Sequence, residues 1–231
     1  MFERPHHRRI ATVLEALDAE VLAANDCFFG GGTAMALRYG EYRESLDIDF
    51  LVSKGDGYRQ LRQRLTGLDG MRTITSPGHA LSQIREVRAD QYGIRTMLQV
   101  AGVDIKFKIV LEGRIEPEAA GPDDRQCGLA TLTPLDMATS KLLANSDRWR
   151  DHAVMSRDLI DLAMMAPPKA LMTRAMAKAE SAYGNSVAAD LASAVEELRT
   201  RPHRLDQCMK AMAMTTVSKA ALWARIKALV R

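Results

Sequence analysis

The sequence predicts an α+β protein, in which a mixed sheet with flanking helices is followed by a C-terminal α-helical bundle. Two observations lead to this prediction. Runs of alternating apolar and polar residues, typical of strands, lie in residues 1–130, whereas apolar residues recur at helical spacing after Thr133. Between them, residues 112–128 are polar and rich in turn formers, which indicates a boundary. We therefore expect one domain over residues 1–130 and another over residues 131–231.

The elements of the first part follow from hydrophobic spacing and from glycine and proline positions. Three helices are predicted, at residues 6–24, 33–39 (with Thr33 as N-cap) and 57–68. Strands are predicted at residues 27–31 and 46–52 and in three runs between 81 and 111, with a turn at Ala101–Gly102. The remaining chain is expected to be helical, beginning at Thr133–Pro134.

Bulk properties narrow the class of protein. The net charge of +3 allows a polyanionic partner without requiring one. Cys27, Cys127 and Cys208 lie far apart, which indicates reduced thiols in a cytoplasmic protein and neither a disulfide framework nor a metal cluster. No apolar run is long enough to span a membrane, so we expect no membrane partner. The histidines lack ligand spacing, and His6 and His7 are expected at the surface.

Two aspartates interrupt the apolar run at residues 46–52. Side chains two residues apart on a strand share a face, so Asp47 and Asp49 would project side by side while Leu46 and Ile48 face the core. Adjacent carboxylates repel each other unless a cation lies between them. Such oxygen ligands predict Mg²⁺, or Mn²⁺ in its place, with substrate phosphates as further ligands.

The residues upstream supply features that bind phosphate. Gly31 and Gly32 let the backbone approach a phosphate closely, Thr33 offers a hydroxyl, and the following helix offers N–H groups at its positive end. An isolated Gly-Gly-Thr is usually a turn, and an isolated Asp-x-Asp is usually part of an ordinary strand. Here only thirteen residues, Ala34 to Leu46, separate them, and the combination favours phosphoryl-transfer chemistry.

The stretch GGTAMALRYGEYRESLDIDF resembles motif I of the DNA polymerase β-like nucleotidyltransferase superfamily, in which a glycine pair and a spacer precede Asp-hydrophobic-Asp. More narrowly, it resembles the AbiEii/AbiGii toxin family. The matching residues are Gly31, Gly32, Thr33, Ala34, Arg43, Ser45, Asp47 and Asp49. The resemblance implies a polymerase β-like fold in which Asp47 and Asp49 bind magnesium. It also implies that the nucleotide-binding residues include Gly31, Gly32, Thr33, Arg43 and Ser45.

A second block, residues 133–162, is similar to the helical motif of the same family, a lysine followed by Arg-Asp-x-x-Asp-Leu. Lys141, Arg157, Asp158 and Asp161 match it. The resemblance implies that Lys141 and Arg157 bind the nucleotide, with Lys141 steadying the triphosphate, and that Asp158 positions Arg157 or the substrate. Without motif I, an ordinary solvated helix face would be the commoner interpretation of this block.

The superfamily uses a third carboxylate on a neighbouring strand, and here the pattern leaves two interpretations open. Asp104 in VDI satisfies it and would complete the metal ligands, leaving Lys108 to contact phosphate. Similar chains often carry the acid further along, in a segment like IKFEIV, which here reads IKFKIV with Lys108 at that position. In that case catalysis would be impaired. We favour Asp104 as the third ligand.

The resemblance implies a metal-dependent nucleotidyltransferase, a toxin of a bacterial toxin–antitoxin or phage-defence pair. It would transfer a nucleoside monophosphate to a hydroxyl at the 3′ end of tRNA, and a separately encoded antitoxin would restrain it. The α+β domain would be catalytic, and the helical domain would complete the active-site cleft. Two alternatives stay open: a catalytically weakened nucleotide- or partner-binding protein of the same fold, and an antibiotic-modifying nucleotidyltransferase.

Overall fold

The computed structural model describes residues 2–201 and 203–230. The chain divides into two compact units, the first made of Met1–Leu37 and Ser45–Thr133, the second of Arg38–Glu44 and Pro134–Arg231. The short segment Arg38–Glu44 thus belongs with the C-terminal part, although both of its neighbours in sequence belong to the first unit. The sequence had placed this segment in the domain over residues 1–130.

The first unit contains the strands of the described chain and the helices around them. Its helices are α1 (Pro5–Ala16), α2 (Ala19–Ala24), α3 (Gly31–Arg38), α4 (Gly55–Thr66) and the 3₁₀ helix η1 (Gly70–Ile74). Its strands are β1 (Cys27–Gly30), β2 (Ile48–Val52), β3 (Ser82–Gln83), β4 (Arg88–Ala89), β5 (Gly93–Val100), β6 (Val103–Leu111), β7 (Arg125–Gln126) and β8 (Leu129–Ala130).

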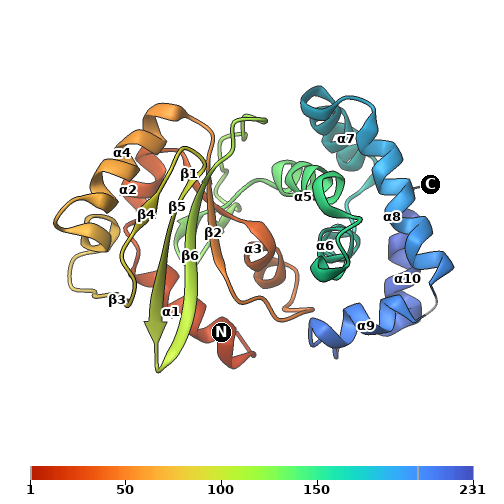
Figure 1. Cartoon of the computed structure of the whole chain (residues 1–231), viewed down its shortest axis with the longest axis horizontal. Helices are drawn as coiled ribbons and strands as arrows, with labels where there is room; N and C mark the ends of the chain where they lie inside the picture. The colour runs from red at the N-terminus through yellow and green to blue at the C-terminus, as the bar shows by residue number, and fades with distance from the viewer. Residues whose placement is uncertain (1, 202, 231) are drawn as a thin grey trace. The chain divides into compact units, whose positions relative to one another are not determined.

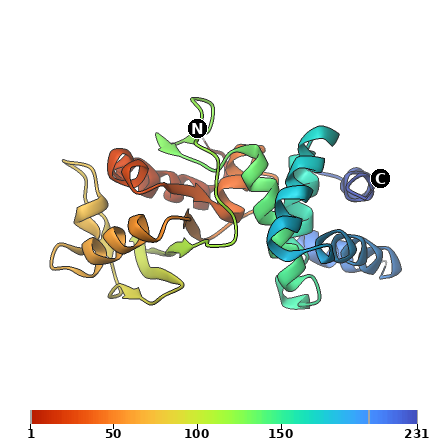
Figure 2. The same cartoon turned by 90° about the horizontal axis from the view of Figure 1, so that it is seen from above.

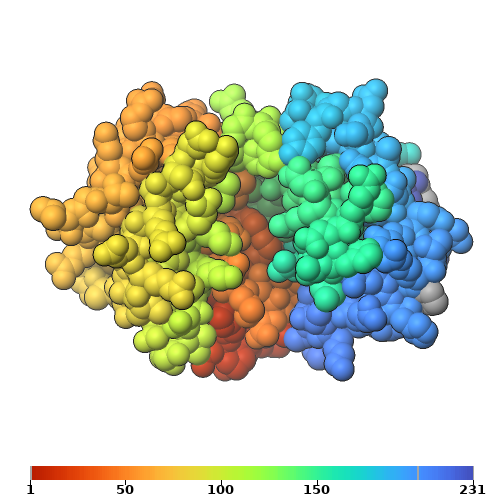
Figure 3. Space-filling model, in the orientation of Figure 1, coloured from red at the N-terminus to blue at the C-terminus, as the bar shows by residue number. Residues whose placement is uncertain are grey.

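Six of these strands form one sheet in the order β1-β2-β6-β5-β3, with β4 also paired to β5 (Figure 1). β2 and β6 run parallel and the other neighbours antiparallel, so the sheet is mixed. With the helices around it, this sheet confirms the predicted α+β class. The residues of β3 are exposed, and Figure 3 shows the yellow segment that contains β3 and β4 on the surface.

The core of the sheet is built from aromatic residues on β1, β2 and β6. The rings of Phe29 and Phe50 lie 5.5 Å apart between centroids, and those of Phe50 and Phe107 lie 5.6 Å apart. Along β6, Ile105, Phe107 and Ile109 are buried, as their alternation with polar residues predicts. This packing fixes β2 between β1 and β6 and so fixes the side chains on its other face.

Two expected elements differ from the sequence prediction. The helix expected at residues 6–24 is broken after Ala16, because Asp18 accepts hydrogen bonds from the N–H groups of Glu20 and Val21 and so starts α2 as a new helix. β2 begins at Ile48, and the Leu46 side chain is 56% exposed. The prediction that Leu46 faces the core is therefore wrong, since it precedes the strand.

Two predicted features of the chain are confirmed by the structure. The turn joining β5 and β6 lies at Ala101–Gly102, where both residues have positive φ (49° and 75°). From Pro134 onward the described chain contains helices and no strands, as Figure 2 also shows for its teal and blue segments. These helices are α5 (Pro134–Arg148), η2 (His152–Val154), α6 (Arg157–Met165), α7 (Lys169–Tyr183), α8 (Ser186–Thr200), α9 (Arg204–Ala211) and α10 (Lys219–Ala228).

Among the helices that the structure describes, none combines the length and the apolar character needed to cross a bilayer. The expectation that the helical part completes an active-site cleft stays a prediction.

Candidate functional site

Asp47 and Asp49 meet a lysine on the neighbouring strand. In the parallel pair of β2 and β6, Asp49 is in register with Lys108. The Lys108 ammonium donates to Asp47 Oδ2 at 3.1 Å and lies 3.4 Å from Asp49 Oδ1. The two carboxylates therefore converge on one point, as their spacing predicts, and that point carries a positive charge.

The charge on Lys108 follows from its surroundings. Burial lowers the pKa of Lys108, but the carboxylates of Asp49 and Asp47 outweigh burial, and the net result is a pKa above the ordinary value for lysine. Lys108 is therefore an ammonium at neutral pH. It serves as a cation in this cluster and is excluded as a general base there.

Gly31 allows the start of α3 to lie against Asp49. Its φ is +67°, and a β-carbon at this position would come within 2.9 Å of both Cβ and Oδ2 of Asp49. Any side chain here would be strained by the backbone and would collide with the carboxylate. The prediction assigned Gly31 to phosphate approach; the structure gives it a second task, which is to leave room for Asp49.

Thr33 joins α3 to the segment that leads into β2. Its side chain is buried, and its hydroxyl donates to the backbone carbonyl of Asp47 and lies 2.8 Å from the hydroxyl of Ser45. Since α3 already begins at Gly31, Thr33 lies inside the helix, and the prediction that it is the N-cap is wrong. These contacts fix the backbone of Asp47. The predicted contacts of Gly32, Thr33 and Ser45 with a nucleotide stay predictions.

Two histidines of α1 also contact the segment that leads into β2. The N–H of Ser45 donates to His7 Nε2 at 3.1 Å, and His6 Nε2 lies 3.1 Å from the carbonyl of Leu46. His6 is 8% and His7 0% exposed, so the prediction of surface residues is wrong. Helical spacing could have predicted their burial. Both lie three or four positions before the buried Ile10 and so share its face of α1.

Asp104, the favoured third ligand, lies elsewhere on β6. It is exposed, faces Gln99 across the β5–β6 pair and accepts a hydrogen bond from the Gln99 amide at 2.9 Å. It precedes Lys108 by four residues, about 13 Å along a strand. The structure therefore brings Lys108, not Asp104, to Asp47 and Asp49. Within the described residues, no group of three acids, histidines or cysteines is arranged to hold a metal.

The donor set of this cluster fits one divalent cation. Magnesium commonly takes one or two protein carboxylates and completes its shell with water and substrate phosphates. Asp47 and Asp49 supply two carboxylates whose oxygens already converge on a cation, the Lys108 ammonium. The same set lacks the third acid that would hold a second metal at this point.

The residues of the second predicted block form a buried ion cluster in the second unit. Lys141 donates to Asp158 Oδ1 at 2.9 Å and lies 2.6 Å from Asp161 Oδ2. Arg43 donates to both carboxylate oxygens of Asp161, at 2.6 and 2.9 Å, and the Tyr42 hydroxyl donates to Asp161 at 2.7 Å. All five residues are buried. The cluster joins α5 and α6 to Arg38–Glu44, the segment that runs from the last residue of α3 to the residue before Ser45.

Arg148 completes this cluster, although no motif in the sequence singles it out. It donates through Nε and Nη2 to the two oxygens of Asp158, at 2.6 and 2.9 Å. Burial raises the pKa of the Asp158 carboxyl, but Lys141 and Arg148 outweigh this and hold it well below its usual range. For Lys141, burial lowers the pKa, but Asp158 and Asp161 outweigh it and the pKa is raised. All these groups are therefore charged at neutral pH.

Lys141 and Arg157, both predicted to act on the nucleotide, lie in different surroundings. The Lys141 ammonium is held between two aspartates, and the residue is only 6% exposed. Arg157 is exposed, and its Nε donates to the carbonyl of Val154 at 3.0 Å. The structure thus pairs Asp158 with Lys141 and Arg148, and not with Arg157 as one of the two predicted roles of Asp158 would require. The predicted contact of Lys141 with a triphosphate stays a prediction.

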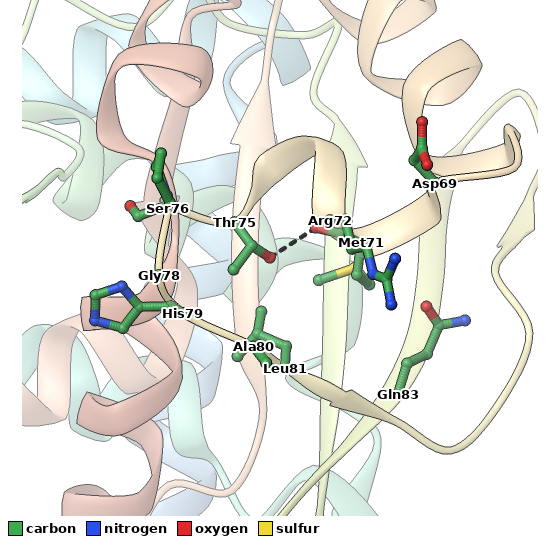
Figure 4. Close-up of a pocket in the computed structure, with 11 residues that line it drawn as sticks. Asp69, Met71, Arg72, Thr75, Ser76, Gly78, His79, Ala80, Leu81 and Gln83 are labelled. Carbon is green, nitrogen blue, oxygen red and sulfur yellow. Dashed lines mark hydrogen bonds between the residues drawn. The ribbon is translucent and has the colours of Figure 1, made fainter.

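Two hollows lie apart from these residues. One, of about 490 Å³, is formed by η1 and the loop that follows it, and includes Arg72, Thr75 and His79 (Figure 4). The Thr75 hydroxyl donates to the Met71 carbonyl there. The other, about 800 Å³, is an apolar hollow between α6, α7 and α10. None of the predicted site residues lines either of them.

Comparison with known proteins gives a family and a fold. The family model described as nucleotidyl transferase AbiEii toxin, type IV toxin–antitoxin system, matches residues 12–229. The crystal structure of JHP933 from Helicobacter pylori is similar at a TM-score of 0.55 and 16% identity, covering 97% of this chain and 90% of JHP933. A second H. pylori crystal structure, described as a candidate nucleotidyltransferase, is similar at a TM-score of 0.51 and 16% identity. The match covers 97% of this chain and 93% of that protein. No curated protein matches the sequence significantly.

Proposed function

Because this chain belongs to the nucleotidyl transferase AbiEii toxin family, we propose that it transfers a nucleoside monophosphate from a nucleoside triphosphate to an acceptor hydroxyl. The acceptor oxygen bonds to the α-phosphorus, the bond from that phosphorus to the β-phosphate oxygen breaks, and pyrophosphate leaves. The hydroxyl proton is lost to water. The observation that carries the proposal is the convergence of the Asp47 and Asp49 carboxylates on one cation position.

Asp47 and Asp49 would be the protein ligands of Mg²⁺ or Mn²⁺. When bound, such a metal supplies positive charge that activates the attacking oxygen and stabilises the phosphates. The chain's own contribution is to hold the two carboxylates in place: the β2–β6 pair fixes Asp49, and the Thr33 hydroxyl fixes the backbone of Asp47. Gly31 brings the positive end of α3 to the same place, where its N–H groups favour an anion.

Arg43, Lys141 and Asp158 support the proposal as positioning residues. Their ion pairs hold Arg38–Glu44, the segment that links the predicted phosphate-binding glycines to Asp47 and Asp49 along the chain. Lys141 is enclosed by carboxylates, which favours this role over direct contact with a triphosphate. Asp158 is equally enclosed, so it would act through Lys141.

The biological part of the proposal follows the family. We expect a toxin whose antitoxin is encoded separately and whose acceptor is the 3′ end of tRNA, as the resemblance implies. The net charge of +3 is compatible with an RNA acceptor.

A second candidate function is favoured by Lys108. With an ammonium between the two carboxylates and no third acid beside them, the chain would bind a nucleotide or partner with little transfer activity. This candidate predicts tight nucleotide binding and no labelled product.

Both candidates are tested by incubating the purified chain with Mg²⁺, one α-labelled nucleoside triphosphate at a time, and either total tRNA or a set of small hydroxyl-bearing antibiotics. The proposal expects label on tRNA, and none with an Asp47→Ala/Asp49→Ala control that circular dichroism shows to be folded. Label on an antibiotic alone would instead indicate an antibiotic-modifying enzyme. Nucleotide binding without label on any acceptor would contradict transfer and support the binding protein.

A further inference from the structure

Lys108 occupies the place where a metal ion would meet the carboxylates. Its ammonium contacts one oxygen of Asp47 and one of Asp49, at 3.1 and 3.4 Å. The register of β2 and β6 sets Lys108 beside Asp49, so this contact is built into the sheet. A divalent cation that used the same oxygens would lie a few ångströms from this ammonium, and the two charges would repel each other strongly in a half-buried site.

The Lys108 ammonium can move away from the two carboxylates. The side chain is 30% exposed, and lysine carries its charge on a flexible four-carbon stem that moves without shifting the backbone of β6. A departing ammonium needs another anion nearby to offset the lost ion pairs. A triphosphate at the start of α3 would supply one, because phosphate is a strong partner for a lysine charge.

We propose that Lys108 is a built-in cation that competes with the divalent metal for Asp47 and Asp49. Metal alone binds weakly because it must displace the ammonium. Metal binds tightly when the Lys108 ammonium pairs with a bound triphosphate and leaves the two carboxylates. A single divalent ion therefore binds together with the nucleotide. The nucleotide half of this inference rests on the proposed function; the metal half does not.

The metal half is tested without nucleotide, by titrating the intact chain with Mn²⁺ in a calorimeter. Lys108→Met keeps the length of the side chain and removes its charge, and we expect it to bind Mn²⁺ more tightly than the unaltered chain by about tenfold or more. Lys106→Met is the matched control, because Lys106 is exposed and lies two residues away on the same strand. It should change the affinity by no more than about twofold, because its charge lies in water.

Adding Asp49→Asn to Lys108→Met should remove the gained affinity, which would place the Mn²⁺ at the carboxylates. Unchanged or weaker binding by Lys108→Met would overturn the proposal, as would an equal gain in Lys106→Met. If Lys108→Met fails to fold, the side-chain NMR signals of Lys108 in the unaltered chain decide. They should move toward those of a solvated lysine as Mg²⁺ saturates the site, and unchanged signals would overturn the competition.

The nucleotide half is tested by repeating the titration in the presence of each non-hydrolysable nucleoside triphosphate. For the unaltered chain, at least one of them should tighten Mn²⁺ binding, and by linkage Mn²⁺ should tighten nucleotide binding by the same factor. In Lys108→Met this coupling should shrink, because no ammonium remains to be transferred; an unchanged coupling would overturn this half. A gain in metal affinity with no tRNA labelling in the transfer assay would keep the competition and reject the proposed function.

Discussion

Gly31 lies directly against Asp49: a β-carbon on Gly31 would come within 2.9 Å of Asp49 Oδ2. The residue at the start of α3 and the carboxylate on β2 are thus fitted to each other, and the φ of +67° at Gly31 is the conformation that brings them together. Seventeen residues, Gly32 to Ile48, separate Gly31 from Asp49 in the sequence, and they include the whole of Arg38–Glu44, which belongs to the second unit. Contact across this interval is therefore set by the fold.

Replacing Gly31 by alanine should displace Asp49 as well as strain the backbone. We expect Gly31→Ala to lower the free energy of unfolding by about 1–3 kcal/mol and to reduce transfer about 100-fold or more. Gly102→Ala is the matched control, because Gly102 also has positive φ (75°) but no atom within 4 Å of an added β-carbon. It should lose comparable stability and keep its activity. Equal activity losses in the two variants would show that strain alone is responsible.

Replacing Thr33 by valine should misplace Asp47, since the hydroxyl that binds the Asp47 carbonyl is lost while the shape is kept. We expect about 1–3 kcal/mol of destabilisation, because a buried carbonyl loses its partner. Steady-state kinetics should show a lower kcat with little change in KM for the nucleotide, and Thr33→Ser should restore kcat. A raised KM with unchanged kcat would instead indicate direct contact between Thr33 and the nucleotide.

Breaking the buried ion cluster should destabilise the second unit. Asp161→Asn removes the charge that Arg43 and Lys141 share, so two buried cations lose part of their compensation. We expect a loss of about 3–5 kcal/mol, measured by urea unfolding. Both tryptophans of the chain, Trp149 and Trp223, lie in this unit, so their fluorescence reports on it.

The control for the ion cluster is Arg199→Met, which removes an exposed pair with Glu196 on α8. It should leave the urea midpoint unchanged, since exposed ion pairs are screened by solvent. If Asp161→Asn matched this control, the cluster would contribute nothing to stability and its positioning role would be wrong.

The same cluster sets the pH range of stability. Asp158 and Asp161 have lowered pKa values in the folded chain, so their stabilisation is complete above the unfolded carboxyl pKa of about 3.9 and is lost as the pH falls below it. Lys141 has a raised pKa, so its contribution is complete below the unfolded lysine pKa of about 10.4 and is lost above it.

Tryptophan fluorescence in urea across this pH range checks both limits. The urea concentration at the unfolding midpoint should be constant near neutral pH and should fall at both acid and alkaline pH. Asp158→Asn should make the fall at acid pH shallower. An acid limb identical in Asp158→Asn and the unaltered chain would contradict the assignment of the lowered pKa to Asp158.

Local patterns predicted the fold class and the carboxylate pair, because both depend on periodicity within a few residues. Alternation along residues 103–110 identified the buried face of β6, and the Asp-x-Asp spacing placed Asp47 and Asp49 on one side. The partner of that pair was not predictable in this way. Which residue of β6 lies beside Asp49 depends on the register of a parallel pair, and that is set by packing between distant segments.

The helical block shows the same limit. Its match to the family motif identified Lys141, Asp158 and Asp161. The pairing of Asp161 with Arg43 was not predictable in this way, because the two residues lie 118 positions apart in sequence, an interval over which periodicity carries no information. The prediction of Lys141 as a phosphate contact treated α5 as an open helix face. Burial between two aspartates gives it a different environment.

Nucleotidyl transfer by this chain should depend on the carboxylates of Asp47 and Asp49. The most direct test of this dependence is the rate of label transfer from the preferred nucleoside triphosphate to tRNA by Asp49→Asn, which keeps the shape of the side chain and removes its charge. With folding confirmed by circular dichroism, we predict a rate about 1,000-fold or more below that of the unaltered chain. A rate within about tenfold of it would contradict the claim, because the carboxylate would then not hold the charge on which transfer depends.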